Sequence, residues 1–440
     1  MRRFMIRLPR SGVRLAAVPL LLTLFVLTWA PPSAAIPAFA RKYQTSCSTC
    51  HYAYPRLNGF GRAFLNNGLR YPGGDAAVIK DTPVELGAEG NKKAFPKAIW
   101  PADVSGLPLF SVRATGRFSY APDAGGEEAG EEAGGAKTTF EFPHEVEILS
   151  GGTIGESFSY FGAVEFENED GEVAIGFPFR LQWDHRPSFH VRMGEIVVDQ
   201  TPDERRLGRA HYNVTQLPNR TGTWTLEEGQ SGISVWGAMN GSGGRGGFRY
   251  EGGVVNGQGA IDPNSDKDFF ANATYKIGGL GEIGGTEGQN ATTTGFWIDD
   301  QVKLGGFAYI GTATGAVDTT AAEEDFKAFG ATGEFWRSDL TVLGGVMSMK
   351  SEIKGTPDRT SLAWYLEGDY VLYPWLIGYA RYEFTDPDTD ADTPEAQKTV
   401  IPGALFMART NVRFGVEYQL PLDDPRKEGD LLGVQVDFAF

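Results

Sequence analysis

The chain has 440 residues, of which 41% are hydrophobic and 12% aromatic, and its formal net charge at pH 7 is −16. This acidic balance argues against nucleic acid as a partner, because phosphate groups are bound by basic surfaces. A transmembrane helix needs about 20 consecutive apolar residues, and no run of that kind follows the N-terminal segment.

The first 35 residues have the layout of a secretory signal peptide. Five arginines precede an apolar run over residues 15–30, and small residues offer cleavage points after Ala35 or Ala40. An uncleaved membrane anchor is the alternative, but the helix-breaking pair Pro31 and Pro32 favours cleavage. Loss of this segment removes five positive charges and no negative one, which takes the net charge to −21. We therefore expect an exported protein, either soluble in the periplasm or folded as an outer-membrane β-barrel.

Two cysteines, Cys47 and Cys50, stand directly before His51 in the segment Cys-Ser-Thr-Cys-His. This spacing is the attachment sequence of a c-type haem. The two thiols add to the vinyl groups on one edge of the porphyrin, and the adjacent imidazole becomes the proximal iron ligand. A thioredoxin-like dithiol would need a βαβ pattern, and half of a zinc site would need a second cysteine pair. We predict one covalent haem c, bound by Cys47, Cys50 and His51, in a small helical cytochrome head over residues 36–104.

A short helix is expected beside this segment, over residues 55–67, with Gly68 at its C-terminal end. Its apolar side carries Leu57, Phe60, Phe64 and Leu65. Such a face covers a haem or packs as ordinary core.

The sixth iron ligand is not evident from the sequence. Methionine commonly partners the proximal histidine, yet no methionine lies between His51 and Met193. His144 and Met193 are candidates, although each is more readily explained as a barrel-wall residue. The later histidines are His144, His185, His190 and His211. Five-coordinate iron, or a water, Lys or Tyr ligand, stays open.

The head and the rest of the chain carry opposite charge. Residues 36–100 contain nine Lys or Arg and four Asp or Glu, a balance of +5, which leaves −26 for the remainder. This difference favours docking of the head on the rest.

From residue 105 to residue 440 the chain consists of segments about ten residues long in which apolar and polar residues alternate, separated by Gly, Asp, Asn and Pro. Period two indicates half-buried β-strands. Three apolar faces are Val173, Ile175, Phe177, Phe179, Leu181 and Trp183; Phe158, Tyr160, Val164 and Phe166; and Leu362, Trp364, Leu366, Tyr370 and Leu372.

A soluble sandwich would alternate too, but three features favour a membrane barrel. The polar faces hold many charges, as a wet lumen would: Glu145, Glu147, Glu165, Glu167, Glu367, Asp369, Arg381 and Glu383. Aromatic residues gather at strand ends, as in an interfacial girdle: Tyr370, Tyr373, Trp375 and Tyr379. The last segment alternates to its terminal aromatic through Leu432, Val434, Val436, Phe438 and Phe440.

Long and short connections alternate along this region, as in outer-membrane barrels. Residues 121–137 and 199–222 are long, whereas residues 337–339 and 373–374 are short. We predict a transmembrane antiparallel barrel of about 16 strands, with both ends in the periplasm. The stretch 278–290 does not alternate cleanly, so the count is open by two.

Two polar features of this region each have two possible interpretations. Four carboxylates in residues 125–132 either gather cations or form a solvated acidic loop. His144 shares phase with the lipid face, but a bulge at Pro143 would turn it inward.

The head sequence resembles the fused cytochrome–porins of iron-oxidising and related bacteria. The shared residues are Pro37-Ala38-Phe39-Ala40-Arg41, Cys47-Ser48-Thr49-Cys50-His51, Pro55, Leu57, Phe60-Gly61-Arg62-Ala63-Phe64 and Asn67-Gly68. This motif covers some thirty residues; over the barrel only the pattern is similar.

The resemblance implies electron transfer at the outer membrane through the haem head, which lies on the periplasmic side or inside the barrel. In the best-known members the donor is Fe(II), and a soluble periplasmic carrier accepts the electron. The expected surroundings are therefore outer-membrane lipid, that carrier and an external reductant, with no nucleic acid. A transport pore with a structural or sensory haem plug and a soluble periplasmic cytochrome are the rival functions.

Overall fold

The computed structural model describes residues 38–75, 89–98, 110–121, 138–169, 171–198, 206–259, 263–284, 297–317, 320–391, 396–423 and 431–440. The predicted signal peptide and the acidic loop 125–132 lie outside these residues, so both stay predictions.

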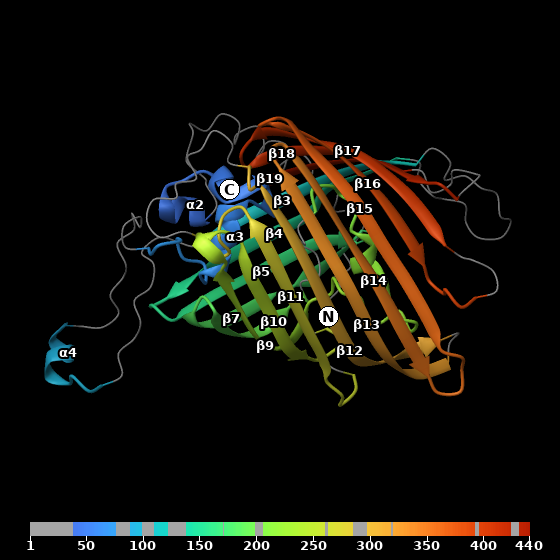
Figure 1. Ribbon diagram of the computed structural model, residues 1–440, viewed down its shortest axis with the longest axis horizontal. Helices are drawn as coiled ribbons and strands as arrows, with labels where there is room; N and C mark the ends of the chain where they lie inside the picture. Colours follow the sequence, from blue (N-terminus) through green and yellow to red (C-terminus); the bar gives the residue numbers. More distant parts are fainter. Residues whose placement is uncertain are drawn as a thin grey trace.

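The N-terminal region consists of short elements; those over residues 38–75 form the head, and the helix over residues 89–94 stands apart from them (Figure 1). These are α2 Ala38–Tyr43, the 3₁₀ turn η1 Cys47–Thr49, β1 His51–Ala53, β2 Arg56–Leu57, α3 Gly59–Asn66 and α4 Glu89–Ala94. Strands β1 and β2 pair as a tiny antiparallel hairpin. None of the described helices is long and apolar enough to cross a membrane.

The rest of the chain closes into one antiparallel barrel (Figure 1). Its strands are β3 Phe110–Tyr120, β4 Thr138–Ile154, β5 Phe158–Glu169, β6 Glu172–Gly176, β7 Phe179–Arg186, β8 Phe189–Ile196, β9 Gln230–Asn240, β10 Gly247–Val255, β11 Asp268–Gly278, β12 Gln301–Val317, β13 Thr320–Arg337, β14 Leu340–Ile353, β15 Arg359–Tyr373, β16 Leu376–Asp386, β17 Gln397–Arg409, β18 Val412–Pro421 and β19 Leu431–Ala439. Two short helical elements lie in the connections, α5 Asn213–Gln216 and η2 Ser242–Gly244.

The predicted number of strands is confirmed among the described residues. Both β6 and β7 pair with β5, so they act as one strand interrupted at Pro178. Proline lacks the N–H that a ladder needs, but the Pro178 carbonyl still accepts from the Ala163 N–H at 2.9 Å. Counted this way the barrel has sixteen strands. It closes where β19 pairs with β3, with two backbone hydrogen bonds between Val112 and Phe440.

The alternation predicted from the sequence separates the two faces of the wall. On β15, Leu366 and Leu372 are more than half exposed on the outside, whereas Glu367 and Asp369 are fully buried inside. Apolar residues outside and polar residues inside are the arrangement of a membrane-spanning barrel. A closed barrel also satisfies every strand's hydrogen bonds within the sheet, as a lipid environment requires.

The predicted aromatic girdle is correct in part. Tyr370, Tyr373 and Trp375 lie exposed at the β15–β16 turn, and the rings of Tyr373 and Trp375 stack at 5.1 Å. Tyr379 was assigned to the same girdle wrongly. It shares the inward phase of its strand with Arg381 and is only 6% exposed.

Both the head and one long connection fill the lumen. The head elements α2 and α3 lie at the end of the barrel where the chain terminates (Figure 1). From the opposite end, the connection between β8 and β9 folds into the barrel. Its described residues 206–229 are called the inserted segment here, and Val214, Trp224 and Leu226 in it are at most 2% exposed. These side chains form a core with inward residues of the wall.

We expect a Leu366→Arg variant to lose about 2–4 kcal/mol of folding free energy, because Leu366 lies midway along β15 on the outer face. A Leu340→Arg variant, at the first residue of β14, should lose far less, since charge is tolerated near the interfaces. Denaturant titration of the protein folded into lipid vesicles measures both. Equal losses would argue against a lipid-facing midplane at Leu366.

Candidate functional site

The Cys47–His51 segment is a 3₁₀ turn followed by a strand. Ser46 caps the turn, its hydroxyl accepting from the Ser48 N–H, and the Cys50 N–H donates to the Cys47 carbonyl at 3.2 Å. The chain then runs into β1, so His51 lies at the start of the hairpin. This tight turn keeps both thiols and the imidazole within one short loop.

Asn58 connects this loop to helix α3. Its side-chain oxygen caps the helix by accepting from the Gly61 N–H at 2.9 Å, and its amide donates to the Ser48 and Thr49 carbonyls at 3.2 Å each. The Asn58 N–H donates to the Cys50 carbonyl at 3.0 Å. Four hydrogen bonds of one residue therefore fix the loop against the helix.

This cap also corrects the helix predicted over residues 55–67. The helix begins at Gly59, because Asn58 is its N-cap and the hairpin β1–β2 occupies the preceding residues. Leu57 therefore lies in β2 and not on the helix face. The predicted end is right, since Gly68 has a φ of +69° after the last turn. Gly61 is required by packing, because a Cβ there would lie 2.0 Å from the Cys50 carbonyl oxygen.

The two thiols are not joined in a disulfide. Burial raises the pKa of the Cys50 thiol to about 12, with the neighbouring Cys47 adding to the effect, and burial also raises the pKa of Cys47. Reactive dithiols have lowered pKa values instead. The neighbouring Thr410, from the β17–β18 turn, lowers the pKa of the Cys47 thiol and so opposes the effect of burial.

His51 has the partner expected of a metal-binding histidine. Its Nδ1 lies 3.1 Å from the Pro55 carbonyl oxygen, across the hairpin turn. A backbone carbonyl at one ring nitrogen fixes the tautomer and directs the other nitrogen, Nε2, to a metal. Two thiols, a fixed imidazole and a supporting carbonyl are the donor set that a c-type haem needs, so the residues present fit this group.

The hairpin packs on an apolar cluster inside the barrel mouth. Tyr52 and Ala53 are buried against inward residues of β13 and β15–β17, and the rings of Tyr52 and Trp336 meet at 5.1 Å. The Arg413 guanidinium donates to the Tyr54 carbonyl at 2.5 Å. The segment is therefore held between a helix on one side and the barrel wall on the other.

Charge fixes the head in the mouth, as the opposite charges of the two regions predicted. Arg56 forms ion pairs with Glu367 and Asp369, all within the lumen. Arg70 reaches Asp184 at 2.7 Å, from the other side of the head. The head is therefore in extensive contact with the barrel wall.

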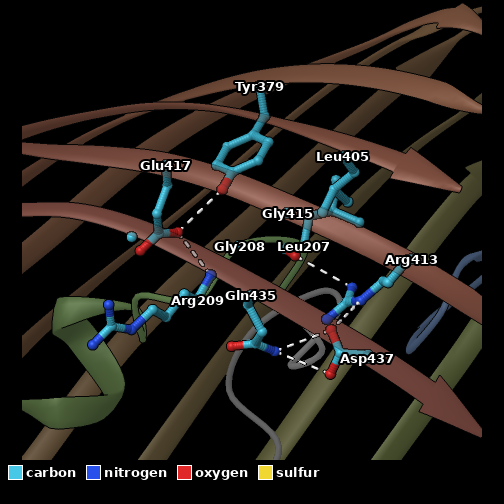
Figure 2. A pocket seen from close by; sticks show the side chains of 11 residues that line it. Leu207, Gly208, Arg209, Tyr379, Leu405, Arg413, Gly415, Glu417, Gln435 and Asp437 are labelled. Carbon is cyan, nitrogen blue, oxygen red and sulfur yellow. Dashed lines mark hydrogen bonds and ion pairs between the residues drawn. The ribbon is translucent and has the colours of Figure 1, made fainter. Parts of the chain in front are cut away.

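A small pocket lies in the lumen (Figure 2). It is bordered by the start of the inserted segment and by inward residues of β16–β19, and its lining combines the apolar side chains of Leu207 and Leu405 with charged and amide-bearing ones. Glu417 accepts from the Tyr379 hydroxyl at 3.0 Å and from the Arg209 N–H at 2.7 Å. The cavity neighbours the Cys47–His51 segment but is not lined by it.

The charged residues that were predicted to line the lumen do face inward, but they form ion pairs with one another and with other residues. Arg113 contacts Glu145 and Glu147, and Arg381 contacts Glu367 and Glu383. Within the described part of the chain, no three His, Cys, Asp or Glu side chains are grouped to hold a metal ion. These ion pairs join neighbouring strands of the wall, except that of Arg381 with Glu383, which lies within β16.

Of the two candidate sixth ligands, Met193 is poorly placed, whereas His144 faces the lumen. A bulge between β3 and β4 turns His144 inward, as Pro143 suggested, and it pairs with Glu141 at 2.8 Å. Its strand neighbour Glu145 pairs with Arg113, which lies 5.9 Å from the Tyr54 ring, so His144 stays a predicted candidate. Met193 is 49% exposed on the outside.

The remaining histidines have partners outside the Cys47–His51 segment. His185 is exposed, next to Trp183 on the outer face. His190 is buried on Asp184 at 2.9 Å, and His211 pairs with Glu227 in the inserted segment.

An Asn58→Ala variant should lose about 1–2 kcal/mol, since it removes a helix cap and two bonds to the loop. The head should become protease-sensitive while the barrel stays folded, measured by limited proteolysis. Asn168→Ala is the control, because Asn168 makes a similar bond to the Gly171 N–H at the far end of the barrel. Equal protection of the head in both variants would contradict the role of Asn58.

Comparison with known proteins gives a distant likeness only. No protein-family model matches the chain, and no curated protein matches it. Among solved structures, the loop L8 deletion mutant of OmpT, an outer membrane protein of Vibrio cholerae, has 15% identity and a TM-score of 0.49, over 75% of this chain and 98% of that one. An anion-selective porin from Comamonas acidovorans has 12% identity and a TM-score of 0.47, over 75% and 98%. Such scores carry no argument, so the porin-like architecture rests on the sixteen strands themselves.

Proposed function

We propose that this protein lies in the bacterial outer membrane and transfers electrons through one c-type haem bound by Cys47, Cys50 and His51. The observation that carries the proposal is the Cys47–His51 loop, with two unbridged thiols and an imidazole whose Nδ1 is already engaged by the Pro55 carbonyl. The apolar exterior and polar interior of the barrel support the membrane location.

When bound, the haem supplies the one-electron chemistry. The chain's own residues hold and surround it. Cys47 and Cys50 are the attachment points, His51 offers Nε2, and Asn58 keeps the loop in one conformation. The buried rings of Tyr52 and Trp336 exclude water beside the hairpin, and low polarity of this kind is one of the levers on a haem potential.

The position of the head supports a periplasmic location for the haem. Short turns and both described chain ends lie at the end of the barrel that holds the head, which is the periplasmic end of outer-membrane barrels. We propose that a soluble periplasmic carrier meets the head there. The electron donor is an external reductant, for which the resemblance of the head suggests Fe(II).

The test is spectroscopic, on protein purified from outer membranes. We expect a pyridine haemochrome of one haem c per chain, and a reduced spectrum that develops when Fe(II) is mixed in a stopped-flow instrument. Ascorbate is the control reductant. Reduction by ascorbate but not by Fe(II) would remove iron as the donor and keep the cytochrome; absence of haem would remove the cytochrome itself.

The rival function, a transport pore, predicts an open lumen. The described lumen is occupied by the head and the inserted segment, which meet at Arg56 and Tyr212, 3.0 Å apart. We therefore expect little ion conductance from the protein in planar bilayers, with or without haem. High conductance unaffected by haem loss would favour the pore.

A further inference from the structure

The methionines of the barrel differ sharply in position. Met193 and Met239 are more than 40% exposed on the outer face, and Met347 and Met349 are fully buried against the inserted segment. Met407 differs from all of these. It lies on β17 at the mouth that holds the head, half-buried.

Three observations bring Met407 to the Cys47–His51 segment. Its side chain packs on the cluster that contains Tyr52 and Ala53, the two residues after His51. Its partner across β18 is Arg413, whose guanidinium holds the Tyr54 carbonyl.

The third observation is the turn that follows Met407. Thr410, three residues further along, lies beside the thiol of Cys47 and lowers its pKa, against the larger effect of burial. The β17–β18 hairpin, which carries Met407, therefore lies along the chain between Cys47 and Tyr54.

We propose that Met407 supplies the sixth ligand of the haem iron, opposite His51; this rests on the proposed function. A thioether is a soft, neutral ligand that commonly partners a proximal histidine and raises the reduction potential. Met407 is unbranched and partly exposed, so its sulfur has freedom to adjust. Among the described residues, no other methionine faces the lumen at this mouth of the barrel, since Met239 lies at the same end but is exposed on the outer face. The barrel would then supply one of the two axial ligands of the haem that the head holds.

The experiment compares Met407→Leu with Met349→Leu, a control that changes an inward methionine elsewhere in the lumen. Both swaps nearly conserve volume. We expect wild type and Met349→Leu to show the weak far-red charge-transfer band and the strongly shifted methyl proton resonance of methionine-bound haem. Met407→Leu should keep its covalent haem by pyridine haemochrome, lose both signals and have a lower reduction potential.

Met407→His provides the second arm, since it should convert the spectrum to that of bis-histidine haem. Unchanged spectra in either Met407 variant, or a haem-bearing wild type without the methionine signals, would overturn the assignment while leaving the cytochrome intact. A wild type without covalent haem would overturn the proposed function and this inference together. Haem content is therefore the measurement that separates the two failures.

Discussion

A variant with both Cys47→Ala and Cys50→Ala should carry no covalent haem after denaturing electrophoresis and haem staining, whereas the wild type stains. The reason is chemical: the thioether bonds need these two sulfurs, and the chain has no other cysteine. Stopped-flow absorbance changes with any reductant should disappear with the haem.

The barrel of this double variant should still fold. The sixteen strands close through β19 and β3 without using either cysteine, so heat-modifiable migration and outer-membrane fractionation should match the wild type. A Ser48→Ala, Thr49→Ala variant is the matched control, because it changes the same turn and leaves the thiols. Covalent haem in the cysteine variant would disprove the attachment site.

The inward and outward faces of the strands were predictable because side chains alternate strictly between the two faces along each strand. A single alternating run fixes which residues face lipid once one charged residue marks the other face, as Glu367 does for Leu366. Tyr379 was misplaced because its position at a strand end was considered and its phase with Arg381 was not. The inward orientation of His144 was predictable, because Pro143 cannot continue a regular hydrogen-bond ladder and favours a bulge there.

The plug was less predictable. The inserted segment has no period of either kind, so its buried residues, such as Trp224 and Leu226, give no signal in one dimension. Arg56 is separated from Glu367 by 311 positions, and nothing in the sequence pairs them. The haem-binding residues were evident because Cys-x-x-Cys-His is contiguous, whereas Asn58 required the position of the helix start.

Arg56 carries the second large prediction, because it joins the head, the wall and the inserted segment. Its guanidinium binds Asp369, lies 2.9 Å from Glu367 and donates to the Tyr212 hydroxyl at 3.0 Å. The Arg56 side chain is 2% exposed and both carboxylates are fully buried. Glu367 has a second basic partner, Arg381, at 3.5 Å. Arg381 makes no ion pair with Asp369 among the described residues.

An Arg56→Met variant should therefore lose about 3–5 kcal/mol, because removing one partner leaves a buried carboxylate uncompensated. We expect the head to leave the mouth, which limited proteolysis would detect as cleavage near residue 56 and planar bilayers as new conductance. Arg337→Met is the control, since that arginine pairs with Asp300 at the surface and is 72% exposed; it should change neither readout.

Restoring neutrality separates charge from packing in this junction. Adding Asp369→Asn to Arg56→Met removes the uncompensated charge, so protection of the head should return in part. Replacement of a whole buried ion pair by neutral groups is often tolerated, whereas removal of one member is not. If the double variant were cleaved as readily and conducted as much as Arg56→Met alone, the shape and hydrogen bonds of Arg56 would hold the head. The charge of Arg56 would then contribute little.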